Sequence, residues 1–212
     1  QRLAIPGAWI AGLIFALHPV SVESVAWISE QKNTLSQVFY LSSLWTYLRF
    51  DDQRALALAS ARAEPGSAWR YYALASVLFI LAILSKSVTA TLPAALLVIA
   101  WWRRGRLTWR RDVAPLLPWF ALGIAAGLCT AWVERHYVGA EGAAYELDFL
   151  QRCLLAGRVV WFYLGKLIWP VGLSFVYPRW TINASSAWPY VPGLAAIAVL
   201  IVFWTLRRRT RA

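Results

Sequence analysis

The sequence has no methionine and only two cysteines among its 212 residues. Cys129 and Cys153 lie in apolar surroundings, with neither a metal-ligand spacing nor the count of a disulfide framework, so we predict two buried free thiols. The sequence also lacks a glycine-rich phosphate loop, a zinc-ligand spacing and a Ser/His/Asp arrangement, and these absences disfavour the enzyme classes that depend on them. Because the chain opens on Gln1 and has no methionine, we expect it to be a piece of a longer protein.

Charged residues are scarce and unevenly placed. Ten acidic residues oppose 21 basic ones, while 60% of the chain is hydrophobic. This balance is far from that of a soluble domain and is typical of a polytopic membrane protein. The 14 tryptophans and nine tyrosines fit aromatic belts at the two membrane interfaces. The net charge of +11 does not indicate nucleic-acid binding, because the arginines fall in short runs between and after apolar segments.

Seven apolar runs predict seven helices. They lie near residues 5–18, 35–50, 69–84, 88–102, 115–133, 153–169 and 189–206. The sixth carries Arg152, Arg158 and Lys166 on less than half of a helical wheel, which favours an amphipathic helix in the membrane interface over a crossing. The predicted fold is therefore all-α, a polytopic membrane bundle of about six crossing helices plus one interfacial helix, in a single domain over residues 1–212.

Three arginine-rich segments predict the orientation in the membrane. They are residues 49–70, residues 103–111 and the tail from residue 207. Because cytoplasmic loops carry an excess of Lys and Arg, we expect these segments in the cytoplasm. The connection after the first helix, the turn at residues 85–87 and the acidic stretch 134–148 then lie on the external side.

The polar segment after the first helix is the candidate functional site. Pro19 ends that helix after His18, and Glu23, Glu30 and Lys32 follow closely. A charged group inside hydrocarbon costs roughly 2.5 to 3.5 kcal/mol at a helix centre, so this cluster lies in water or faces a protein-lined cavity. Two interpretations stay open: the rim of an active site, or a hydrated loop between two spans.

The same segment resembles a motif of the transmembrane-and-TPR protein O-mannosyltransferases. It reads His18-Pro19-Val20-x-x-Glu23-x-Val25-Ala26-Trp27-Ile28, followed by Lys32-Asn33 and Leu35-Ser36. Leu84-Ser85-Lys86 resembles the family's Leu-Ser-Lys-Glu turn, with Ser87 in place of the acid. Tyr163-Leu-x-Lys-Leu-x-Trp-Pro170, with Leu173 and Tyr177, resembles a later family segment. The resemblance runs over most of the chain, and its first motif is the specific one.

The resemblance implies an inverting glycosyltransferase of the C-type membrane fold. Such an enzyme moves a mannose-like hexose from a polyprenyl-phosphate donor to a hydroxyl of an acceptor protein or glycan, at the periplasmic face of a bacterial inner membrane or the lumenal face of the ER membrane. The family's catalytic base is an aspartate in its first external loop, which is expected upstream of Gln1, and TPR repeats are expected after Ala212. We therefore expect no catalytic residue in this chain, and an isolated piece without activity.

Six residues are predicted to bind the donor. Glu23 is suited to place a divalent Mg²⁺ or Mn²⁺ ion or the phosphate, or else it only solvates a helix start. His18 is suited to bond the phosphate or orient Glu23, or else it is a satisfied structural group. The other four are cations on the external side, which clamp phosphate or pair with acids and lipid headgroups instead; they are Lys32, Lys86, Arg158 and Arg179. Tyr163, Tyr177 and Trp180 are interpreted as ordinary interfacial aromatics.

Two other functional classes stay open. A transporter or lipid carrier places charges inside its spans and breaks helices at mid-depth, whereas these spans are nearly free of charge. A non-catalytic membrane anchor for TPR repeats does not need His18, Glu23 and Lys86 to converge, so their positions distinguish it from an enzyme.

Overall fold

The computed structural model describes residues 7–59, 65–137, 147–174 and 176–209. Within these residues the fold contains eight α-helices and no strand, which confirms the predicted all-α class. The chain divides into two compact units, residues 1–139 and residues 140–212, and each is described by itself. A single domain over residues 1–212 stays a prediction.

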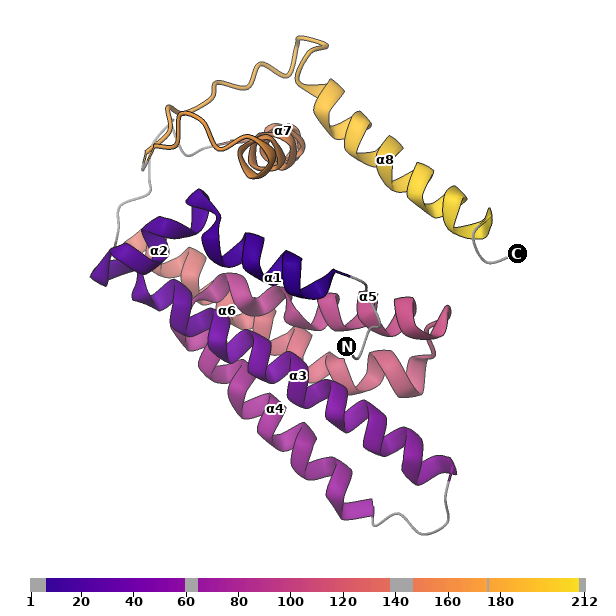
Figure 1. Cartoon of the computed structure of the whole chain (residues 1–212). Helices are drawn as coiled ribbons and strands as arrows, with labels where there is room; N and C mark the ends of the chain where they lie inside the picture. Colours follow the sequence, from indigo (N-terminus) through magenta and orange to yellow (C-terminus); the bar gives the residue numbers. More distant parts are fainter. Residues whose placement is uncertain (1–6, 60–64, 138–146, 175, 210–212) are drawn as a thin grey trace. The chain divides into compact units, whose positions relative to one another are not determined.

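Six α-helices build the described part of the first unit (Figure 1). They are α1 (Ala8–Leu17), α2 (Val22–Ala26), α3 (Gln31–Ala59), α4 (Pro65–Ser85), α5 (Leu92–Arg104) and α6 (Leu117–His136). Short 3-10 turns, Pro19–Ser21, Ile28–Glu30 and Ser87–Thr91, lie between them, and a π-helical turn, Trp109–Val113, leads toward α6. The long helices α3 and α4 pack side by side (Figure 1).

The core of the first unit is aromatic. Trp119 of α6 is 1% exposed and stacks on Phe79 of α4, with ring centroids 4.6 Å apart. Tyr47 of α3 meets the same indole edge-on at 5.3 Å, so three helices share one aromatic contact. The indole N–H of Trp119 donates to Ser76 Oγ at 3.0 Å. This bond satisfies the one polar group of a buried tryptophan, which would otherwise destabilise the core.

Among the described residues, two helical stretches are long and apolar enough to cross a membrane. They are Ala68–Ser85 and Trp109–His136. The helices Ala8–Leu17 and Pro19–Ala26, bent by 55°, make a third candidate if they form one broken span. The bend lies where Pro19 was predicted to end the first helix, because proline lacks an N–H and restricts the residue before it. These helices indicate membrane association, but the predicted number of six crossings is not confirmed.

The seven predicted helices are all present, and α3 differs most from its prediction. It was expected to end near Phe50 and instead continues to Ala59. The apolar run that predicted this helix ends at Phe50, just before Asp51 and Asp52, yet these carboxylates pair with arginines at the end of α5. Because the partners come from a distant segment, hydropathy along α3 alone does not reveal that the helix continues.

The prediction of two buried thiols was wrong. Both Cys129, on α6, and Cys153, on α7, are exposed in the structure. Apolar neighbours in sequence indicate an apolar segment, but they do not determine which helix face a residue occupies. Here both cysteines lie on outward faces of their helices.

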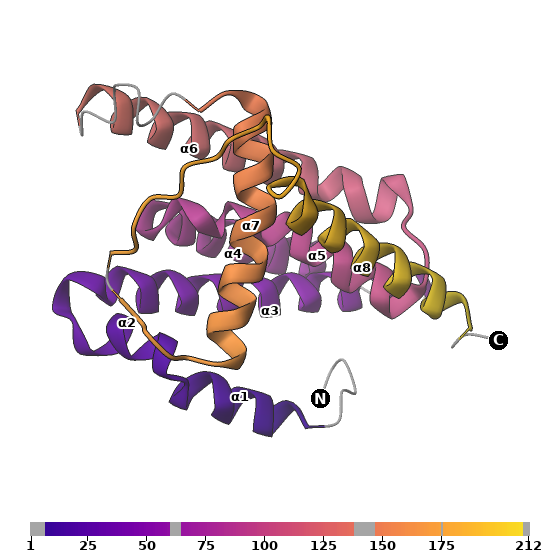
Figure 2. The same cartoon turned by 90° about the horizontal axis from the view of Figure 1, so that it is seen from above.

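The described part of the second unit contains α7 (Phe149–Ile168), an irregular segment and α8 (Tyr190–Arg209). A capping box starts α7: Phe149 N–H donates to the Asp148 carboxylate at 2.7 Å, and Asp148 N–H donates to Gln151 Oε1 at 3.0 Å. Figure 1 shows α7 end-on and α8 lengthwise, whereas Figure 2 shows both lengthwise, so the two helices cross steeply. They approach each other at Gly157 and Gly193.

Gly157→Ala is expected to destabilise the second unit. A Cβ atom at this position would lie 2.8 Å from backbone atoms of Gly193, closer than atoms pack in a protein interior. Separating the helices to admit it should cost about 1–3 kcal/mol, measured as a lower melting temperature of the purified chain in detergent. Gly165→Ala on the same helix is the control, because nothing lies within 4 Å of its Cβ position. Equal melting temperatures for the two variants would contradict the close crossing.

Candidate functional site

Two of the sequence motifs meet in the first unit. Lys86 Nζ donates a hydrogen bond to Asn33 Oδ1, a residue 53 positions earlier in the chain. Asn33 Nδ2 in turn donates to Glu30 Oε2 at 2.8 Å and to Ser24 Oγ at 3.0 Å. We refer to these four residues, Ser24, Glu30, Asn33 and Lys86, as the Lys86 network. It joins the first motif to the Leu84-Ser85-Lys86 turn.

The backbone on both sides holds Lys86 in place. α4 ends at Ser85, and Lys86 is extended (φ −160°, ψ 121°) before the next 3-10 turn begins. Its N–H still donates to Ala82 O at 2.9 Å. Its carbonyl accepts from Thr89 N–H at 3.1 Å and from Thr89 Oγ1 at 2.8 Å. These bonds fix the backbone of Lys86, and its side chain is half-buried.

The charge of Lys86 is held by a neutral amide. Among the described residues, the ion pair of this segment joins Lys32 to Glu30 at 3.3 Å, and the acceptor for Lys86 is the uncharged Asn33. The Lys32 side chain is 54% exposed, so its pair with Glu30 contributes at most about 1 kcal/mol. Within the described parts of the chain, no carboxylate lies within ion-pair distance of the half-buried Lys86, and this position favours an anionic ligand.

His18 and Glu23 lie where their non-binding interpretations place them, at a turn and at a helix start. His18 Nδ1 accepts a hydrogen bond from Val20 N–H at 3.2 Å and so caps the turn that begins at Pro19. Glu23 is exposed in the first turn of α2, where an acid interacts favourably with the helix dipole. Neither residue is one of the four in the Lys86 network. Sequence reasoning selected Glu23, whereas the structure joins Lys86 to the neighbouring motif residue Asn33.

A metal site at Glu23 stays a prediction. Within the described parts of the chain, no three His, Cys, Asp or Glu side chains are placed to hold a metal ion together. One exposed carboxylate does not supply the near-octahedral oxygen shell that Mg²⁺ requires, so these residues alone do not fit the ion.

The second unit contains a groove between α7 and the segment 177–182. Its volume is about 840 Å³. We call it the α7 groove, and the lining residues used below are Gln151, Arg152, Leu155, Val159, Phe162, Tyr163, Tyr177, Arg179 and Trp180. Tyr163 and Tyr177, which the sequence suggested were only interfacial aromatics, face the same groove. Their shared membership in the third motif was the available signal.

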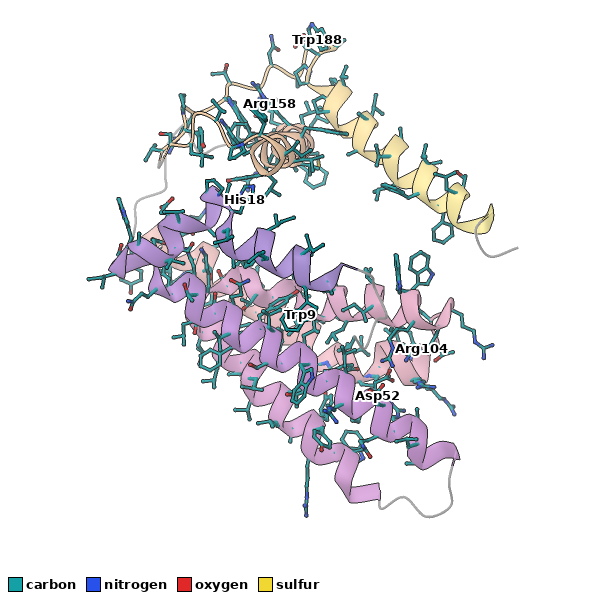
Figure 3. All side chains as sticks on the ribbon, viewed as in Figure 1. Trp9, His18, Asp52, Arg104, Arg158 and Trp188 are labelled. Carbon is teal, nitrogen blue, oxygen red and sulfur yellow. The ribbon has the colours of Figure 1, made fainter. Side chains whose placement is uncertain are left out.

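The two predicted phosphate-binding arginines belong to this second unit. Arg179 is exposed and lines the α7 groove. Arg158, labelled in Figure 3, is exposed beside it, with its guanidinium 4.4 Å from the centre of the Trp180 ring. Trp180 in turn meets Phe162 edge-on at 4.9 Å. Stacking on tryptophan orients a guanidinium without neutralising it, so Arg158 keeps its charge.

A second group of charges joins α3, α5 and the turn before α6. We call it the Asp–Arg cluster, and its members are Asp51, Asp52, Arg103, Arg104, Arg111 and Asp112. Arg104 pairs with Asp112 and, at 2.5 Å, with Asp51. Figure 3 shows Arg104 and Asp52 in the same part of the first unit. The sequence analysis used these arginines to predict the orientation in the membrane, and it missed that three of them make internal ion pairs.

Comparisons of this chain with models of protein families, with sequences of characterised proteins and with solved structures found no match. The resemblance to O-mannosyltransferases therefore rests on the motif residues themselves. Their placement, rather than an overall similarity, carries the functional argument.

Proposed function

We propose that this chain is the membrane part of a glycosyltransferase that takes a hexose from a polyprenyl-phosphate donor. The observation that carries the proposal is the contact between Lys86 and Asn33, which unites two motifs 53 residues apart. The consecutive helices α3 and α4 already bring these two segments near each other, and the hydrogen bond joins one motif residue of each. The acceptor in this proposal is a hydroxyl on a protein or glycan.

Lys86 has the chemistry that such a transfer needs. The acceptor oxygen forms a bond to the anomeric carbon while the bond from that carbon to the phosphate oxygen breaks. The acceptor proton goes to a base, which the resemblance places outside this chain, and negative charge builds up on the departing phosphate. A fixed ammonium group stabilises charge as it develops. Lys86 is the proposed stabilising group, and Asn33 is a positioning residue whose amide is held by Glu30 and Ser24.

The remaining predicted residues support the proposal more weakly. Arg158 and Arg179 lie in the second unit and are proposed to attract a lipid phosphate there, since guanidinium groups bind phosphate through paired N–H donors. Lys32 is the weakest candidate, because it is already paired with Glu30. His18 and Glu23 are proposed to shape the rim around the Lys86 network.

The first unit has polar clusters separated by the thickness of a bilayer. Asn33 of the Lys86 network and Asp51 of the Asp–Arg cluster are both on α3. Their separation in sequence corresponds to about 27 Å along a helix axis, close to the roughly 30 Å of a hydrocarbon core. We infer that the chain crosses the membrane six times, through α1, α3, α4, α5, α6 and α8, with the Asp–Arg cluster in the cytoplasm and the Lys86 network at the periplasmic or lumenal face. On this proposal α7, which combines Arg158 and Lys166 with an apolar face, lies in the external interface.

Donor use by the full-length protein tests this proposal. In sealed vesicles of known orientation, we expect labelled hexose to be transferred to a hydroxyl acceptor when the polyprenyl-phosphate hexose is on the external face. A polyprenol-linked hexose without the phosphate is the control, because it lacks the anionic leaving group. Transfer from a nucleotide sugar alone, or equal use of the control lipid, would show that the chain serves a different reaction.

A further inference from the structure

The α7 groove is elongated, and its middle is lined by apolar side chains. Its lining on α7 runs from Gln151 to Tyr163, a separation of about 18 Å along a helix. Between these ends α7 contributes Leu155, Val159 and Phe162. The opposite wall runs antiparallel, because Gln151 Nε2 donates to Ile182 O at 3.4 Å whereas Phe162 meets Tyr177 at 5.0 Å.

The charge around the groove is positive. Asp148 is the only acid among the described residues of this unit, and it is used to cap α7. Arg152 and Arg179 line the groove, and Arg158 lies beside it over Trp180. Arg152 Nε donates to Leu147 O at 2.8 Å, which fixes the stem of that side chain. Since a guanidinium has five N–H donors, this bond leaves most of its donors available to an anion.

The apolar middle of the α7 groove, with guanidinium groups beside it, favours some classes of ligand over others. A free sugar or nucleotide would leave Leu155, Val159 and Phe162 uncovered, whereas a hydrocarbon chain buries them. An anionic head on that chain matches the arginines.

We propose that the α7 groove binds the polyprenyl chain of a phosphate-bearing lipid, with the chain along Leu155, Val159 and Phe162 and the phosphate at Arg179. The identification of the lipid as the sugar donor rests on the proposed function. The preference for a hydrocarbon chain with an anionic head comes from the groove itself, through its apolar lining and its arginines. Arg158 holds the wall of the groove through Trp180 and adds positive charge beside it.

Photocrosslinking of the full-length protein in nanodiscs tests the groove without requiring turnover. The probe is a polyprenyl phosphate that carries a diazirine near its head and no sugar. We expect crosslinks within residues 151–163 or 177–182. Arg179→Gln should lower the crosslinking yield by about tenfold, because a charge-assisted pair is lost. Arg179 is exposed, so we expect this variant to fold, and its melting temperature is measured in parallel.

A matched pair of variants tests the apolar middle. Val159 lines the groove, whereas its neighbour Val160 is 54% exposed and lies outside the lining. Val159→Trp should block crosslinking by filling the α7 groove. Val160→Trp should leave the crosslinking yield within about twofold of the native chain. Equal yields for the two variants, or no loss in Arg179→Gln, would overturn the proposal.

Competition distinguishes the possible sources of the ligand. Excess unlabelled polyprenyl phosphate should abolish the crosslink, while polyprenol, inorganic phosphate and phosphatidylglycerol should not. Equal competition by phosphatidylglycerol would make the groove a site for bulk lipid and would sink the assignment. Crosslinking that persists while hexose transfer fails would leave the groove assigned and reject the proposed function. Transfer without crosslinking in the groove would do the reverse.

Discussion

Asp112→Ala should destabilise the first unit by about 3 kcal/mol, the lower end of what breaking a buried ion pair costs. Asp112 is 3% exposed and accepts hydrogen bonds from Thr108 N–H at 2.6 Å and from Thr108 Oγ1 at 2.9 Å. It also pairs with Arg104, whose side chain is 22% exposed. Alanine would remove both hydrogen bonds from Thr108 and leave Arg104 with Asp51 as its carboxylate partner. Chemical unfolding of the purified chain in detergent, followed by circular dichroism, measures the loss.

Asp52→Ala is the matched control for this prediction. Asp52 belongs to the same cluster, but its side chain is 32% exposed and its partner Arg103 is 28% exposed. Ion pairs near water contribute about 0–1 kcal/mol, so this variant should be close to native. A double-mutant cycle between Asp112→Ala and Arg104→Ala should give a coupling of about 0.5–3 kcal/mol. Equal losses for the two aspartates would show that burial does not set their contributions.

The Asp–Arg cluster also explains where sequence reasoning about the fold stopped. Apolar runs locate the helices because an apolar segment of that length has few stable structures other than a helix. Pro19 fixes the end of α1. The polar end of α3 has no such local signal. Asp51 and Asp52 remain helical because Arg103 and Arg104 meet them from α5, 51 and 53 positions away in the chain. A contact of that range depends on how the helices pack, which a hydropathy pattern does not specify.

The Lys86 network was predictable in part. Lys86 was selected because a lone cation in a short turn between two apolar helices is unusual. Asn33 was part of the first motif, whereas Lys86 belongs to the second. The pairing of the two residues depends on tertiary packing. Because α3 and α4 are consecutive and pack side by side, the start of α3 lies near the end of α4. The helix order predicts this proximity, but the register that brings Asn33 to Lys86 does not follow from it.

The α7 groove shows a different limit of sequence reasoning. The amphipathic pattern of α7 was visible because helical periodicity repeats along the chain. Its opposite wall, residues 177–182, has no regular secondary structure and therefore no period to detect. Tyr177 and Trp180 become groove residues only when that segment folds back onto Phe162.

Lys86→Met should reduce hexose transfer by about 10²–10³-fold while leaving the fold intact. Methionine keeps most of the apolar stem but removes the ammonium group that stabilises the departing phosphate, and removal of one such group has costs of that order. Because the charge develops in the transition state, kcat should fall more than KM rises. The measurement is steady-state transfer by the full-length protein in vesicles, with the melting temperature of each variant taken in parallel.

Lys32→Met provides the comparison that isolates this effect. Lys32 belongs to the first motif, next to Asn33, but it is 54% exposed and paired with Glu30, so its replacement should change kcat by less than about twofold. Lys86→Arg should recover only part of the activity, since the larger guanidinium must replace an ammonium group already seated on Asn33. If Lys86→Met instead lowers the melting temperature and leaves kcat unchanged, Lys86 only fastens α4 to the start of α3. The contact with Asn33 would then support the fold and no longer the proposed transfer.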